Sequence, residues 1–305
     1  MITFITTFKP FKPPFDLIQL NALKSWLRFC PPCEVVIVGA DEGVEDVVKQ
    51  LPFVKIVHNV KRSPSGAPLL DDLIRRGEEL TTNNLICLIN GDIIIVDDIL
   101  KVVKTVSNMF NTNFLLLCRR YDMIVNKPLD YKKDPIDYLR SHIIRDYAES
   151  NKKPVCADLF VFSRRLFNRV PPLVIGRLRW LIYEALSNGN PVIDATELLT
   201  VIHQIHGYDH ISDLPMKNSF LRAKLSYEAI AISPDYNWNL RQAGVAAYFS
   251  EKDCNYILTH DGLKKNRFGL FVEKVGYDSV AKHFYKPICY NSFKDLYRRR
   301  LLGKP

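Results

Sequence analysis

Short apolar runs alternate with longer segments of helical periodicity along most of the chain, a pattern typical of strands that are covered by helices on both faces. The apolar runs predict strands over Ile2–Thr6, Glu34–Gly39, Phe53–Asn59, Leu85–Val96, Asn113–Cys118 and Val155–Phe162. Helical spacing of apolar residues predicts helices over Phe15–Phe29, Leu69–Leu80, Asp97–Phe110, Asp134–Glu149 and Leu178–Ser187. This alternation predicts an α/β fold with a mostly parallel sheet and right-handed crossovers.

One of the predicted strands contains a polar break. Leu85–Val96 is interrupted by Asn90, Gly91 and Asp92, so that a glycine and a carboxylate follow a buried apolar run. A carboxylate at this point lies at the carboxyl edge of a parallel sheet, where α/β proteins bind their ligands. The same residues also fit a turn between two core strands, because Asn-Gly is a common hairpin signal.

The Asn90-Gly91-Asp92 segment and its strand resemble the nucleotide-sugar-dependent glycosyltransferases of the GT-A fold, in particular family 2-like bacterial and viral members. In that fold a Rossmann-like sheet, flanked by helices, ends on an Asp-x-Asp motif that holds a divalent metal and the sugar diphosphate. Here Asn90 replaces the first carboxylate, and Asp92 is the position that matches. The resemblance implies a hexosyltransferase that uses a nucleotide sugar, with a UDP-sugar expected, and Mn²⁺ or Mg²⁺, which prefer oxygen ligands.

The resemblance also implies how the chain is divided. Residues 1–210 would form the GT-A catalytic domain, with a nucleotide-binding half over 1–100 and an acceptor and metal half over 101–210. Residues 211–305 would form a C-terminal helical extension or lid over the donor.

Three segments of the first half are candidates for binding the donor. Thr6, Thr7 and Phe8 follow the first strand, where the resemblance places the nucleotide. Asp41 follows the second strand, where it can accept a hydrogen bond from a ribose hydroxyl or a base, or cap the next helix. Arg62 belongs to a basic loop before a helix, which suits phosphate binding.

Histidines supply the other candidate metal ligands. His203, His206 and His210 fall within eight residues, in a His-Gln-x-His-x-Tyr-x-His segment that is similar to a bacterial and viral group of GT-A transferases. The resemblance implies that one of them completes the metal site of Asp92; His206 is the first choice, and His203 and His210 come second. A zinc site built from the histidines and a purely structural role are the alternatives.

Two carboxylates are candidates for the catalytic base. Asp158 lies inside an apolar strand, where a carboxylate is either paired or functional. Glu184 shares a helix face with Trp180, as in sites where a ring covers a sugar and a carboxylate binds its hydroxyls. The alternative for this helix is that Trp180 packs in the core with Glu184 outside. An inverting transfer needs such a base, whereas a retaining transfer does not.

Composition limits the remaining possibilities. The 305 residues carry a formal net charge of +9, which favours anionic partners but does not choose among them. A nucleic-acid-binding protein and a viral-type DNA-base glucosyltransferase therefore remain alternatives, whereas a nucleotidyltransferase would require a glycine-rich signature near the first strand. No apolar stretch is long enough to span a membrane, and we expect a cytoplasmic protein. The acceptor stays open between a glycan, a small molecule and modified DNA.

Overall fold

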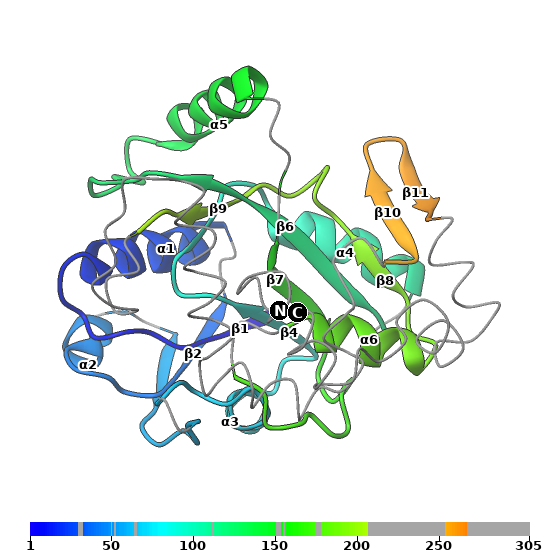
Figure 1. The fold of residues 1–305 in the computed structure, drawn as a ribbon, viewed down its shortest axis with the longest axis horizontal. Helices are drawn as coiled ribbons and strands as arrows, with labels where there is room; N and C mark the ends of the chain where they lie inside the picture. The colour runs from blue at the N-terminus through cyan, green and yellow to red at the C-terminus, as the bar shows by residue number, and fades with distance from the viewer. Residues whose placement is uncertain are drawn as a thin grey trace, which may run out of the picture.

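The computed structural model describes residues 1–29, 33–49, 51, 53–63, 66–110, 113–150, 154, 156–174, 178–206 and 254–266 (Figure 1). The strands are β1 (Ile2–Thr6), β2 (Glu34–Val38), β3 (Val54–Val57), β4 (Leu85–Ile89), β5 (Ile93–Ile95), β6 (Leu115–Met123), β7 (Ala157–Ser163), β8 (Val192–Asp194), β9 (Val201–Gln204), β10 (Tyr256–Thr259) and β11 (Gly262–Lys265). The helices are α1 (Phe15–Phe29), α2 (Val44–Val48), α3 (Leu70–Leu80), α4 (Ile99–Phe110), α5 (Ile136–Ser150) and α6 (Arg179–Ser187).

The strands form one mixed, mostly parallel sheet. Its main path runs in the order β11-β10-β8-β6-β7-β4-β1-β2-β3. Strands β4, β1, β2 and β3 are mutually parallel, and β7 is inserted antiparallel between β4 and β6. The predicted α/β class and the mostly parallel sheet are therefore confirmed.

Helices cover both faces of this sheet, because successive strand residues point to opposite faces. On one face α1, α2 and α4 pack against Phe4 and its neighbours, and on the other α3 and α6 pack against Ile5 and its neighbours. Trp26 of α1 is fully buried, stacks on Phe4 with ring centroids 5.7 Å apart, and donates its indole N–H to the carbonyl of Ile93 at 2.8 Å. Helix α1 is thereby fixed to the strand that follows the Asn90–Asp92 turn.

Strand β6 belongs to two parts of the sheet. Its first residues pair with β7 and β8, whereas Arg120 to Met123 pair in parallel with β9, which pairs on its other side with β5. Helix α5 packs on this smaller β5–β9–β6 layer, as the upper part of Figure 1 shows. The predicted end of this strand at Cys118 was wrong, because the arginines that follow continue the strand in ion pairs.

Within the segment expected to be a helical extension, residues 254–266 form the β10–β11 hairpin. It extends the sheet by parallel pairing of β10 with β8. Tyr256, Ile257 and Thr259 favour the first strand of the hairpin, and Gly262, which follows the turn, adopts a φ of +114°. The rest of 211–305, and His210 before it, lie outside the described residues. In the described part of the chain, no helix combines the length and the apolarity needed to cross a membrane.

Candidate active site

The break between β4 and β5 is a turn that changes partner strands and does not form a hairpin. Strand β4 pairs with β1 and β7, whereas β5 pairs with β9. The N–H of Asn90 donates to the carbonyl of Asp158 at 3.4 Å, and the N–H of Ile93 donates to the carbonyl of Asn90 at 3.2 Å. The alternative of a turn between two core strands is therefore confirmed, but the two strands do not pair as a hairpin. The turn places Asp92 at the carboxyl edge of the sheet.

Gly91 allows the loop after β1 to approach this turn closely. A Cβ atom at Gly91 would lie 2.6 Å from the ring of Phe8 and 3.0 Å from the carbonyl oxygen of Thr7. Phe8 is itself buried, with its ring 6.2 Å from that of Trp26. The requirement for glycine is thus one of space, since a side chain would collide with a ring that cannot move away.

Asp92, His203 and His206 come together in space. The Nε2 atoms of His203 and His206 lie 3.5 and 3.3 Å from Oδ2 of Asp92, and one ligand atom from each residue lies within 4.8 Å of the others. Burial disfavours the carboxylate, but the two histidines hold the pKa of Asp92 well below its usual value. The carboxylate is therefore charged, and the cluster offers one oxygen and two nitrogen ligands.

The chemistry of this cluster fits a divalent cation. Oδ1 of Asp92 is buried and has no hydrogen-bond partner among the described residues. A buried carboxylate oxygen without a partner is costly, and a metal ion would satisfy it. Manganese suits a site of mixed carboxylate and imidazole ligands, and magnesium can use the carboxylate together with phosphate oxygens.

Asp122 fixes the orientation of His203. Nδ1 of His203 lies 2.9 Å from Oδ1 of Asp122, its register partner on the adjacent strand β6. A proton on Nδ1 that is donated to Asp122 leaves Nε2 facing Asp92, which is the arrangement found in metal sites that place a carboxylate behind a ligating histidine. Burial lowers the pKa of His203, but Asp122 and Asp92 outweigh this effect and raise it to about 9. Without a metal ion, the two carboxylates therefore favour the protonated form of His203.

Arg120 connects this cluster to Asp158. Its guanidinium lies 3.1 Å from Asp122 and forms a short ion pair with Asp158. Burial raises the pKa of Asp158; the charge of Arg120 opposes this rise and that of Asp92 adds to it. The structure thus places Asp158 beside the cluster of Asp92, His203 and His206, in a network of alternating charges that ends at Asp92.

A second group of predicted residues gathers at the ends of β1 and β2. Asp41 and Arg62 form an ion pair of 2.8 Å, and Arg62 also donates to the carbonyl of Gly66 at 2.9 Å. A Cβ atom at Gly39, whose φ is +96°, would lie 3.4 Å from Arg62 and 3.6 Å from the hydroxyl of Thr7. Thr7 and Arg62 therefore lie beside one glycine, and Asp41 joins them through its ion pair with Arg62. The alternative of Asp41 as a helix cap is wrong, because Gly43 occupies the N-cap of α2 and the Asp41 carboxylate binds Arg62.

Thr6 and Phe8 have less access to a ligand. The side chains of both are buried, and the hydroxyl of Thr6 lies 3.4 Å from the carbonyl of Thr7. The Phe8 ring packs between Trp26 and Phe11. Their side chains hold the loop, so contact with a nucleotide at these two positions would have to come from the backbone.

Comparison with known proteins gives distant structural matches. No family model and no curated protein matches the chain. The structure is similar to that of S. aureus TarS 1-349 in complex with UDP-GlcNAc, at 11% identity and a TM-score of 0.46, over 76% of this chain and 67% of that chain. It is also similar to the mannosyltransferase PcManGT from Pyrobaculum calidifontis in complex with GDP-Man and Mn²⁺, at 14% identity and a TM-score of 0.43, over 80% of this chain and 73% of that chain. In another structure of TarS 1-349 the match spans 38% of that chain and 42% of this one, with a TM-score of 0.32.

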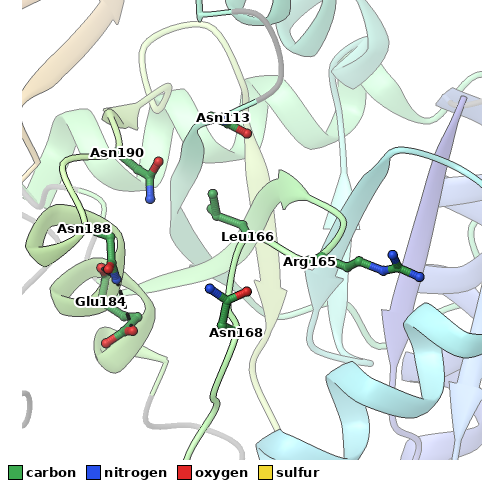
Figure 2. Close-up of a pocket in the computed structure, with 7 residues that line it drawn as sticks. All are labelled: Asn113, Arg165, Leu166, Asn168, Glu184, Asn188 and Asn190. Carbon is green, nitrogen blue, oxygen red and sulfur yellow. Dashed lines mark hydrogen bonds between the residues drawn. The ribbon is translucent and has the colours of Figure 1, made fainter.

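Glu184 lies at the opposite edge of the sheet from Asp92. It lines a polar cavity of about 250 Å³, and Figure 2 shows it beside Asn188, whose side-chain amide donates to it at 3.1 Å. Asn113 and Asn190 of the same cavity precede β6 and β8, which run parallel to β4, so this is the amino edge of the sheet. The structure therefore does not bring Glu184 to Asp92, His203 and His206. Trp180 is buried against Phe167, so the alternative of a core tryptophan is confirmed.

Sequence reasoning missed Arg120 and Asp122. The strand was predicted over Asn113–Cys118, so neither residue was a candidate, although the two are spaced two apart and so lie on one face of β6. Polar residues that alternate in this way directly after an apolar strand were the available signal. Which residues face them depends on the pairing of β6 with β9, which the sequence alone does not reveal.

Proposed function

We propose that this protein is a glycosyltransferase that moves a sugar from a nucleotide-sugar donor to an acceptor hydroxyl, with a divalent cation held by Asp92, His203 and His206. The observation that carries the proposal is the cluster itself. Asp92 is charged and half-buried, its buried Oδ1 has no partner among the described residues, and two histidine nitrogens lie within 3.5 Å of its Oδ2. It lies at the carboxyl edge of a mostly parallel sheet, where ligands of α/β proteins bind.

Each part of the site has a role in this reaction. A bound Mn²⁺ or Mg²⁺ supplies positive charge that stabilises the leaving diphosphate. Thr7, Asp41 and Arg62 bind the nucleoside, and Asp92 and the two histidines hold the cation. Arg120 orients Asp158, whose raised pKa suits a group that accepts a proton from the acceptor hydroxyl in an inverting transfer.

UDP is the nucleotide we propose first, because the Asn90-Gly91-Asp92 segment resembles enzymes for which a UDP-sugar is the expected donor. The acceptor is proposed only as a hydroxyl compound, among glycans, small molecules and modified DNA. Calorimetry of the purified protein against UDP, GDP and their sugars, with Mn²⁺ and with EDTA, tests the donor and the metal together.

The matched variants for this experiment are Asp92→Ala and Asp46→Ala. Asp46 is an exposed carboxylate on α2 that pairs only loosely with Lys49 at 3.3 Å. We expect saturable, metal-dependent binding of one nucleotide sugar to the wild type and to Asp46→Ala, and loss of that binding in Asp92→Ala. A folded wild type that binds none of these donors would overturn the proposal. Salt-sensitive binding to DNA without metal or nucleotide would then favour a nucleic-acid-binding protein.

A further inference from the structure

Lys9 is a partly buried cation that reaches toward the metal cluster. Its ammonium lies over the ring of Phe15, 4.1 Å from the centroid, and the same ring contacts that of His206 at a centroid distance of 5.1 Å. Burial lowers the pKa of Lys9, whereas the charge of Asp92 raises it. Among the described residues, no carboxylate lies within ion-pair distance of this ammonium. A desolvated cation beside an aromatic face, without a paired anion, is suited to bind an anionic ligand.

The backbone of Lys9 is held rigidly. The buried side chain of Gln19 accepts from the N–H of Lys9 at 2.6 Å and donates to its carbonyl at 3.0 Å. The two preceding residues press against Gly91. The backbone of Lys9 is therefore held in place relative to Asp92, by Gln19 on one side and by the contact of Thr7 and Phe8 with Gly91 on the other.

The location of Lys9 identifies the part of the ligand that it meets. Thr7 lies beside Gly39 and Arg62 in the proposed nucleoside site, and Gly91 is next to Asp92 in the proposed metal site. Residues 7 to 9 therefore connect the proposed nucleoside site with the proposed metal site. In a nucleotide sugar, the group between the nucleoside and the sugar is the diphosphate, and lysine is a common point-charge ligand of phosphate.

We propose that Lys9 binds the diphosphate of the donor, as a second source of positive charge beside the metal. This inference rests on the proposed function and adds a residue to it. Lys9 would hold the diphosphate in the ground state and stabilise the charge that grows on it when the bond to the sugar breaks. It is not needed to neutralise Asp92, because two histidines already contact that carboxylate.

Binding of whole nucleotides and of their parts tests this role. Calorimetry with UDP, GDP, uridine, guanosine and inorganic pyrophosphate, all with Mn²⁺, is carried out on the wild type, Lys9→Met and Lys9→Arg. The control is Lys12→Met, since Lys12 is on the same loop but exposed and paired with Glu42 at 3.8 Å. We expect Lys9→Met to weaken the binding of the nucleoside diphosphate and of pyrophosphate roughly 10- to 100-fold, the range for a hydrogen bond to a charged group. Lys9→Arg should retain most of the affinity, and Lys12→Met all of it.

The nucleosides separate a phosphate contact from general damage. Uridine or guanosine should bind equally well to the wild type and to Lys9→Met, with an unchanged melting temperature. An equal loss for the nucleoside and the diphosphate would overturn the inference, and so would undiminished diphosphate binding in Lys9→Met. In both cases the proposed function would stand, because the wild type would still bind its nucleotide. A wild type that binds no nucleoside diphosphate would instead overturn the two proposals together.

Discussion

Asp122 provides a graded test of the proposed metal site. Its Oδ1 atom accepts from Nδ1 of His203 at 2.9 Å and also lies 3.1 Å from Nε of Arg120. Residues that orient a metal-ligating histidine from behind typically change metal affinity 10- to 100-fold. Asp122→Asn keeps an oxygen that can accept from His203 but loses the charge, so we expect Mn²⁺ to bind about tenfold more weakly, or about 1.4 kcal/mol. Asp122→Ala removes the acceptor and frees the ring, and we expect a loss near 100-fold, or about 2.7 kcal/mol.

The assay is a titration of free Mn²⁺ by electron paramagnetic resonance, at one pH and with His203→Ala as the reference for a lost ligand. Asp46→Asn, an exposed carboxylate on α2, is the control and should bind Mn²⁺ as the wild type does. Mn²⁺ at about 100 times its Kd should also raise the free energy of unfolding of the wild type by about 2.7 kcal/mol. The reasoning is refuted if Asp122→Ala binds Mn²⁺ with wild-type affinity. If both Asp122 variants lose binding as completely as His203→Ala, Asp122 is itself a ligand.

Three further predictions concern stability and the limits of the site. Asp72→Asn should lower the free energy of unfolding by about 2 kcal/mol at neutral pH, because a buried carboxylate loses charged bonds to Arg75 and Arg76. Burial raises the pKa of Asp72, but the Lys61 N–H and the two arginines bring it below its usual value. Urea unfolding should therefore show the full stability difference between wild type and Asp72→Asn above the pKa of Asp72 in the unfolded chain, and the difference should disappear as the pH falls through its pKa in the folded protein. Gly91→Ala should cost about 1 to 3 kcal/mol in thermal unfolding and weaken Mn²⁺ binding, since its Cβ meets the buried Phe8 ring; unchanged values for both would contradict the packing argument. Glu184→Gln should leave the rate of donor turnover unchanged, and a large fall in that rate would show that the amino edge of the sheet takes part.

The fold was largely predictable because its signals are local. Apolar runs of strand length and helical spacing of apolar residues follow from burial on both faces, and they placed most elements correctly, from Ile2–Thr6 to Arg179–Ser187. The approach of Asp92 to His203 and His206 agrees in geometry with what the resemblance implied, and their role in holding a metal stays a prediction.

The remainder depended on pairings between distant segments. Nothing in the spacing of Trp180 and Glu184 tells which edge of the sheet their helix faces, and the structure places Glu184 away from Asp92. Arg120 and Asp122 resembled a strand end because charged residues usually follow a strand into solvent. Here their charges are satisfied by Asp158 and His203, which come from elsewhere in the chain.

The double pairing of β9 has a consequence for how errors in folding would affect the site. His203 faces Asp122 only because Val201 lies opposite Arg120, and a shift of β9 by one residue would turn His203 to the other face of the layer and present a neighbour in its place. Pairing with β5 on the other side holds the same alignment, with Ile93 opposite His203. Substitutions that loosen either edge of β9, even far from Asp92, would therefore lower the fraction of molecules that can bind a metal, because a slipped, folded population lacks the histidine ligand, whereas the molecules in register would keep their full affinity.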